Sequence, residues 1–73
     1  MTTLYVHPGQ SAYAYPSTLI AECNDHWFAI TAWTIRTLPT RPIGLTDDHR
    51  ISPDLHRLMR VDTQMTRIAE MAA

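Results

Sequence analysis

The sequence predicts an α+β fold, in which a small antiparallel sheet of three or four strands is packed on one face by a C-terminal α-helix. Strand-like segments fill the first half of the chain, a proline-rich stretch follows, and apolar residues then recur at helical spacing. With 73 residues and 45% hydrophobic side chains, the chain is expected to form one domain, 1–73. Its expected parts are a β-hairpin region (1–36), a proline-rich connection (37–51) and a C-terminal helix (52–72).

The chain opens with a segment that favours a first β-hairpin. Apolar side chains alternate along Thr2–His7, and Pro8-Gly9 fits the centre of a type II turn. The chain could then return as a strand over Gln10–Tyr15, which Pro16 would end or leave on a sheet edge. Together with the strands that follow, this hairpin predicts a sheet of three or four strands.

A second hairpin is predicted from Ser17–Cys23 and His26–Arg36, both of strand-like composition. The latter is expected to be a single strand that is apolar on both of its faces. Asn24-Asp25 between the two segments has the turn chemistry of a two-residue hairpin loop. The facing pairs in that register are Cys23 with His26, Glu22 with Trp27, Ala21 with Phe28, Ile20 with Ala29, and Leu19 with Ile30.

This register gives the hairpin two different faces. The first, here called the helix face, is wholly apolar, and we expect the helix to pack on it. Its residues are Leu19, Ala21, Cys23, Phe28, Ile30 and Ala32. The second face has a carboxylate and two threonines among two tryptophans, which is typical of a surface in partial contact with water. Its residues are Thr18, Ile20, Glu22, Trp27, Ala29, Thr31 and Trp33.

The connection and the helix have recognisable start signals. Thr37–Gly44 contains two prolines and a glycine and predicts an irregular crossing from the sheet to the helical part. Thr46, followed by Asp47 and Asp48, could cap one short turn of helix. The main helix is expected to begin with Ser52 as N-cap, Pro53 at the first helical position and Asp54 in the first turn.

Along 53–71 the expected helix has an apolar stripe that would cover the helix face. The stripe consists of Leu55, Leu58, Val61, Met65, Ala69 and Ala72, with Ile68 at its margin. Asp62 falls inside the stripe, so it should lie near an end, reach solvent or meet an arginine. The opposite side of the helix would carry Arg57, Arg60, Gln64 and Arg67.

The second face is the first candidate for binding a partner. One helix covers only one face of a small sheet, and tryptophan and arginine are the residue types most enriched at binding hot spots. Trp27 and Trp33, with Ile20 and Glu22 beside them, are therefore predicted to contact a protein partner or a second copy in a homodimer. The alternative is that the N-terminal hairpin or the proline-rich connection folds over both rings and makes them ordinary core.

The arginine side of the helix is the second candidate. Arg57, Arg60 and Arg67 could bind phosphates or an acidic protein surface, which suggests a nucleic-acid-binding regulator as an alternative function. A solvated helix face explains the same pattern. A net charge of −1 does not attract nucleic acid, and the proline-rich connection leaves little room for the preceding helix that a helix-turn-helix needs.

The residues do not favour a metal, a cofactor or catalysis. Cys23 and His26 have a C-x₂-H spacing, but His49 and His56 are too far apart for the second ligand pair of a zinc site. No glycine-bounded nucleophile or paired-carboxylate motif is present, and two glycines in the whole chain exclude phosphate-binding loops. We therefore expect a protein that is not an enzyme and has no catalytic, cofactor-binding or metal-binding residues.

Compartment signals favour the cytoplasm. No apolar run reaches the roughly 18 residues of a membrane span, and the first residues lack the pattern of a signal peptide. The single cysteine, Cys23, cannot form an internal disulfide, although it could cross-link two copies. We expect a cytoplasmic protein without a membrane partner.

In size and in its strand-then-helix plan, the chain resembles the small inhibitors that bacteriophages encode against host machinery. These include anti-CRISPR proteins and small proteins that bind host RNA polymerase. The resemblance implies a protein that binds a host enzyme or effector complex in the host cytoplasm and blocks it. It assigns no residues, because it rests on no motif. An accessory subunit or an antitoxin-like partner of a larger protein would use the same aromatic surface.

Overall fold

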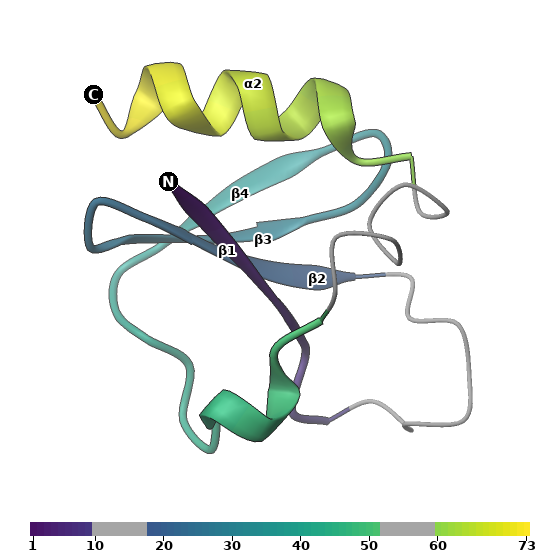
Figure 1. Cartoon of the computed structure of the whole chain (residues 1–73), viewed down its shortest axis with the longest axis vertical. Coiled ribbons are helices and arrows are strands. Elements are labelled where there is room, and N and C mark those ends of the chain that lie inside the picture. The colour runs from purple at the N-terminus through teal and green to yellow at the C-terminus, as the bar shows by residue number, and fades with distance from the viewer. Residues whose placement is uncertain (10–17, 52–59) are drawn as a thin grey trace.

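The computed structural model describes residues 1–9, 18–51 and 60–73. These ranges contain a four-stranded antiparallel sheet and a C-terminal α-helix, which confirms the predicted α+β class (Figure 1). The elements are β1 (Thr2–Val6), β2 (Leu19–Cys23), β3 (His26–Ile30), β4 (Ile35–Leu38), the 3₁₀ helix η1 (Asp47–His49) and the α-helix α2 (Asp62–Met71).

The central hairpin is confirmed in its turn and in its register. β2 and β3 pair antiparallel, with Glu22 opposite Trp27 and Ala21 opposite Phe28. Asn24 and Asp25 have φ values of 51° and 65°, the left-handed conformation that a two-residue hairpin loop requires at both central positions. The division of this hairpin into a helix face and a second face is therefore present in the structure.

The prediction of one strand over His26–Arg36 is wrong, because the chain turns inside it. The Thr31 hydroxyl accepts hydrogen bonds from the backbone N–H groups of Trp33 (3.1 Å) and Thr34 (3.0 Å). The Thr31 N–H in turn donates to the Thr34 carbonyl at 3.0 Å. This turn ends β3 at Ile30 and begins β4 at Ile35, which then pairs with Ile30. The segment looks apolar on both faces because its alternation restarts after the turn.

The strand order in the sheet is β1-β2-β3-β4. β1 pairs antiparallel with β2, with Leu4 opposite Ala21 and Tyr5 opposite Ile20. The fourth strand is thus β4, which takes residues from both the predicted hairpin region and the predicted connection. The predicted return strand Gln10–Tyr15 lies outside the described residues.

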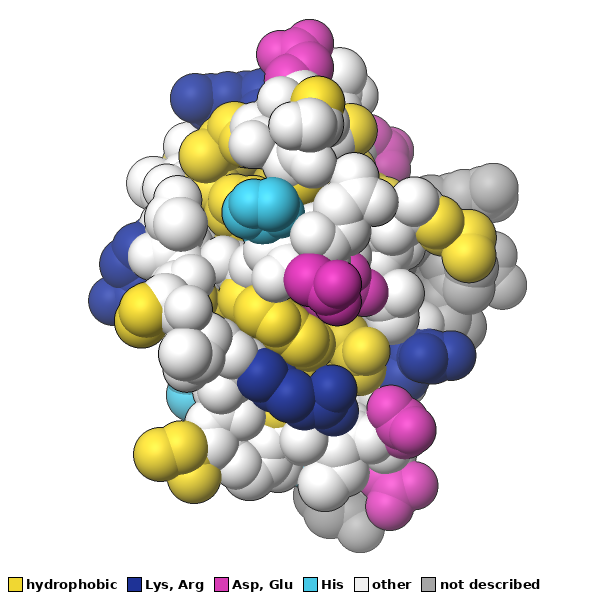
Figure 2. All heavy atoms as spheres, turned by 90° about the vertical axis from the view of Figure 1, so that its left-hand side faces the viewer, with side chains coloured by type: hydrophobic (Ala, Val, Ile, Leu, Met, Phe, Trp, Pro, Cys, Tyr) yellow, Lys and Arg dark blue, Asp and Glu magenta, His cyan; other side chains and the backbone are white. Residues whose placement is uncertain are grey.

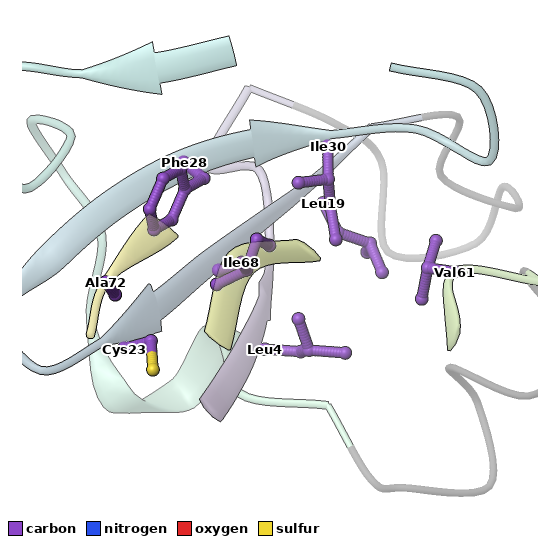
Figure 3. Packing of buried hydrophobic residues seen from close by; sticks show 9 residues of the cluster. Leu4, Leu19, Cys23, Phe28, Ile30, Val61, Ile68 and Ala72 are labelled. Atoms are coloured by element: carbon purple, nitrogen blue, oxygen red, sulfur yellow. The ribbon is translucent and has the colours of Figure 1, made fainter. Parts of the chain in front are cut away.

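The main core lies between the helix face and α2 (Figure 3). Phe28, Leu19 and Ile30 from the sheet are at most 1% exposed, and they pack with Val61 and Ile68, both 0% exposed. The remaining buried members of this cluster are Leu4, Ala21, Cys23 and Ala72. Asn24 also ties the hairpin turn to the end of the helix, because its Nδ2 donates to the Ala72 carbonyl at 3.0 Å.

The prediction of one continuous helix over 52–72 is wrong at Arg60. This residue has a φ of 55°, and the next, Val61, has φ −96° and ψ 8° as the residue before the first helical turn. Neither conformation continues an α-helix, so α2 begins at Asp62. Asp62 is exposed and lies at a helix end, as expected. The predicted start signals at Ser52, Pro53 and Asp54 lie outside the described residues.

The break at Arg60 also changes which side of the helix is buried. Gln64, expected on the solvent side, is 3% exposed, and Ala69, expected in the apolar stripe, is exposed. Ile68, expected at the margin of the stripe, is completely buried. Met65 is partly buried against the core. Since α2 begins only at Asp62, the side chains buried on this side are those of Val61, Gln64, Ile68 and Ala72.

The proline-rich connection lies on the second face of the sheet, opposite α2 (Figure 1). Leu45, only 6% exposed, packs with Tyr5, Ile20 and Ala29 in a smaller core cluster. The expected short helical turn is confirmed as η1, in which the Thr46 N–H donates to Nδ1 of His49 at 3.0 Å. The chain then returns to β1, where the Ile51 N–H donates to the Leu4 carbonyl at 3.0 Å.

Candidate binding surface

Trp27 is half-buried on the second face and belongs to the packing there. Its ring centroid lies 5.9 Å from that of Tyr5, and the guanidinium carbon of Arg41 lies 5.2 Å from the Trp27 ring centroid. Arg41 is held in place because its Nε and Nη2 donate to the Leu45 carbonyl at 3.3 and 3.1 Å. The alternative in which the proline-rich connection covers the ring therefore holds for Trp27.

Figure 2 views the molecule from the left-hand side of Figure 1. It shows hydrophobic side chains gathered in a strip, with a basic side chain directly along one border and an acidic side chain at the other. This strip is apolar surface that the protein leaves open on this side, between side chains of opposite charge.

Trp33 lies elsewhere and is 86% exposed, in the turn between β3 and β4. The expectation that Trp27 and Trp33 share one strand face is wrong, since the turn at Thr31–Thr34 separates them. The hydrogen bonds to the Thr31 hydroxyl fix the backbone of this turn. Trp33 is therefore a large apolar side chain on an ordered turn that its own fold leaves in solvent.

The other two residues of the second face that were predicted to contact a partner, Ile20 and Glu22, expose little surface. Ile20 is 1% exposed and belongs to the smaller core cluster. Glu22 is partly buried, and its Oε2 accepts a hydrogen bond from the Asp25 N–H at 3.0 Å. Ile20 thus forms the floor of the second face, and Glu22 stabilises the hairpin turn.

The predicted arginine side of the helix is not a single helix face. Arg60 precedes α2 and has a left-handed backbone, while Arg67 is exposed and its Nη1 donates to Oε1 of Gln64 at 3.5 Å. Gln64, between them in the predicted stripe, is buried against the sheet. Arg57 lies outside the described residues. No described part of the chain groups these arginines into one phosphate-binding row.

Arg36, which the sequence analysis did not single out, occupies the open part of the second face. It lies on β4 opposite Ala29, and its exposed side chain forms no hydrogen bond or ion pair with any of the described residues. Two cavities of about 210 and 200 Å³ meet at its side chain. The cavity of about 200 Å³ is lined mainly by Thr18, Ala29, Thr31 and Thr34. The cavity of about 210 Å³ is lined by His7, Ile20, Leu38 and the connection from Pro39 to Ile43.

We call β4 with Trp33, Arg36 and Ile43 the β4 surface. Ile43, in the turn at Gly44 (φ 84°), is 100% exposed at the rim of the larger cavity. Among the residues that the structure describes, neither cavity lining contains an aspartate or a glutamate. The signal for this surface in the sequence was the isoleucine and arginine after Trp33, but it could be interpreted only once the turn at Thr31 was known.

The remaining chemical candidates lie apart from this surface. Cys23 and His26 are cross-strand neighbours as predicted, yet Cys23 is 4% exposed on the helix face whereas His26 is exposed and its Nδ1 lies 3.0 Å from the Asn24 carbonyl oxygen. Within 1–9, 18–51 and 60–73, no three His, Cys, Asp or Glu side chains form a group able to hold a metal ion. In the same ranges, no helix has both the length and the apolar character needed to cross a membrane.

Comparisons with protein-family models, with curated proteins and with solved structures each found no match to this chain. What the fold defines is an α+β protein in which a four-stranded sheet is covered by a helix on one face and by an irregular connection on the other. Its function is argued from the residues of the β4 surface.

Proposed function

We propose that this protein is a non-enzymatic binding protein that docks its β4 surface on a protein partner and blocks that partner. The single observation that carries the proposal is the exposure of Trp33, 86% of which is in solvent on a turn fixed by hydrogen bonds. Tryptophan dominates binding energy when it is buried at the centre of an interface. The fold gains nothing from Trp33 in this position, whereas a partner would gain its full burial.

The surroundings of Trp33 support an interface. Arg36 belongs to the other residue type most enriched at hot spots, and it has no partner among the described residues. Because the Thr31 hydroxyl holds the turn, burial of Trp33 would cost little further ordering of the backbone. Ile43 adds a second exposed apolar side chain, at the cavity that Arg36 also lines.

The finer form of the proposal concerns the kind of partner. The small size and the strand-then-helix plan support a phage-encoded inhibitor that binds a host enzyme or effector complex in the host cytoplasm. An anti-CRISPR protein is the first version of this class, and an inhibitor of host RNA polymerase is the second. The absence of catalytic motifs from the sequence supports action by binding alone.

The test uses three immobilised proteins and a bacterial lysate: the natural chain, Trp33→Ala and Met71→Ala. Met71 is a matched control, since it is 51% exposed and apolar. Met71 lies near the C-terminal end of α2, where Ala72 contacts the β2–β3 turn. The β3–β4 turn, which carries Trp33, is contacted by Gln64 near the other end of α2. We expect the natural chain and Met71→Ala to capture the same protein, and Trp33→Ala to retain at least about tenfold less of it, the effect of a hot-spot residue.

The captured protein is then purified and its activity is measured against increasing amounts of the natural chain. We expect the activity to fall until one equivalent is bound, and to be unaffected by Trp33→Ala. Equal capture by all three proteins, or a partner whose activity is unchanged when saturated, would contradict the proposal. Circular dichroism of Trp33→Ala should match that of the natural chain, because the ring makes little contact with the fold.

A further inference from the structure

We infer that the partner segment bound by the β4 surface is an extended strand that pairs with the outer edge of β4 and places an acidic side chain opposite Arg36. This inference rests on the proposed function and specifies how the partner is recognised. It is carried by the open edge of β4, by the direction of the β4 backbone groups and by the charge of the surface beside them.

The two edges of the sheet differ. At the outer edge of β1, Tyr5 forms a bridge with Arg50, and the Ile51 N–H donates to the Leu4 carbonyl at 3.0 Å. At the outer edge of β4, no segment within 1–9, 18–51 or 60–73 is paired. An open edge is a row of backbone donors and acceptors to which another chain can add a strand.

The hydrogen bonds of the turn fix which β4 groups point outward. Since the Thr31 N–H donates to the Thr34 carbonyl, the alternation of an antiparallel pair directs the N–H and C=O of Arg36 and Leu38 toward β3. The N–H and C=O of Ile35 and Thr37 then point to the open edge. Pro39 follows and has no N–H, so the edge offers donors at two positions and ends there.

Arg36 is positioned to select an acidic residue on the added strand. Because its backbone groups point inward, the residue opposite it on an added antiparallel strand occupies a non-hydrogen-bonded site, where the facing Cα atoms are only about 4.5 Å apart. A carboxylate there could form a bidentate pair with the guanidinium. Arg41 and His7 line one of the cavities beside Arg36, and no described residue of either lining is acidic, so an acidic side chain of the partner would supply the complementary charge.

A second copy of this chain is a poorer occupant of the edge. Two copies of β4 related by a two-fold axis perpendicular to the sheet keep most of this short strand paired only when Arg36 or Thr37 faces itself, because facing residues share a sheet face. The first register brings the two Arg36 side chains directly together. The second leaves them as diagonal neighbours, about 7–8 Å apart. Neither provides a carboxylate, since β4 contains none.

The test uses synthetic peptides of about eight residues, the length of an ordinary strand, with alternating valine and threonine and one central glutamate. Matched peptides carry glutamine or lysine at the centre. The natural chain, labelled with ¹⁵N, is titrated with each peptide while amide shifts and hydrogen exchange are followed. We expect protection at the amides of Ile35 and Thr37, and binding of the glutamate peptide about two- to fivefold tighter than the glutamine peptide, as for a cross-strand charge pair.

Arg36→Glu should reverse the preference, so that the lysine peptide binds best, and Thr37→Pro should abolish protection while leaving the β3–β4 pairing intact. Unchanged amides at Ile35 and Thr37, or equal affinity for the glutamate and lysine peptides, would overturn the inference. So would amide shifts that follow protein concentration without any peptide, which would assign the edge to a second copy. If Trp33→Ala abolishes partner capture but Arg36→Glu and Thr37→Pro do not, the proposed function stands and this mode of recognition fails.

Discussion

The two faces of the β2–β3 hairpin are covered by different kinds of structure. The cover is complete on the helix face and partial on the second face. On the helix face a regular element, α2, seals the apolar side chains, so that Phe28 and Ile30 are 1% and 0% exposed. On the second face an irregular connection makes the cover with one leucine, Leu45, and one arginine, Arg41. The second face is therefore closed over Trp27 and open beside Arg36.

This difference follows from the geometry of the covering segments. A helix presents an apolar side chain every three or four residues and can follow the sheet over its whole length. The connection between β4 and η1 contains prolines and exposes most of its side chains, so it contacts the sheet at few points. The open surface available for binding lies where the regular cover is missing.

Truncation of an aromatic side chain on each face should give the largest difference in stability between the two faces. Phe28→Ala removes a completely buried ring from the main core and should lower the free energy of unfolding by about 3–5 kcal/mol, a large share of what a chain this short possesses. Trp27→Ala should cost roughly half as much, since its ring is only half-buried. Urea unfolding followed by circular dichroism measures both, and equal losses would show that the two faces are equally important to the core.

Removal of the Arg41 side chain should weaken the packing of the second face alone. Arg41→Ala loses two hydrogen bonds to the Leu45 carbonyl and the contact with the Trp27 ring, and it should lower the free energy of unfolding by about 1–2 kcal/mol. Arg36→Ala is the matched control and should change it by less than about 0.5 kcal/mol.

The same variants can be followed through Trp27 itself in a Trp33→Phe background, where Trp27 is the only tryptophan. Arg41→Ala should increase quenching of its fluorescence by acrylamide, because the guanidinium no longer covers the ring. Arg36→Ala should leave the quenching unchanged. An equal increase in both variants would show that Arg41 does not act as a specific cover.

Much of the fold could be predicted because it depends on local rules. The Asn24-Asp25 turn, the register of β2 with β3 and the apolar helix face all follow from two-residue turn chemistry and strand alternation. The short helical turn at η1 followed from Thr46 and the two aspartates after it. Each of these features is set by residues close together in the sequence.

The candidate site could not be predicted in the same way, because it depends on where the alternation restarts. A hydroxyl at Thr31 turns the chain through side-chain bonds to two backbone N–H groups, and threonine is otherwise a common strand residue. Without that turn, simple alternation places Trp33 on the same face as Trp27. Long-range packing then decided the rest, since the cover over Trp27 comes from Arg41 and Leu45.

The smallest expected change in stability comes from a substitution at Arg60. Its sign tests whether the helix that covers the helix face begins only at Asp62. Arg60 has a left-handed φ of 55°, which favours glycine, so Arg60→Gly should raise the free energy of unfolding by about 0.5–1 kcal/mol. In a continuous helix the same change would lower it by about 0.5–1 kcal/mol. Arg67→Gly, inside α2 and also exposed, provides that destabilising control. Thermal unfolding that shifts upward for Arg60→Gly and downward for Arg67→Gly would establish that the helix over the core begins after Arg60, and a downward shift for both would support a single continuous helix.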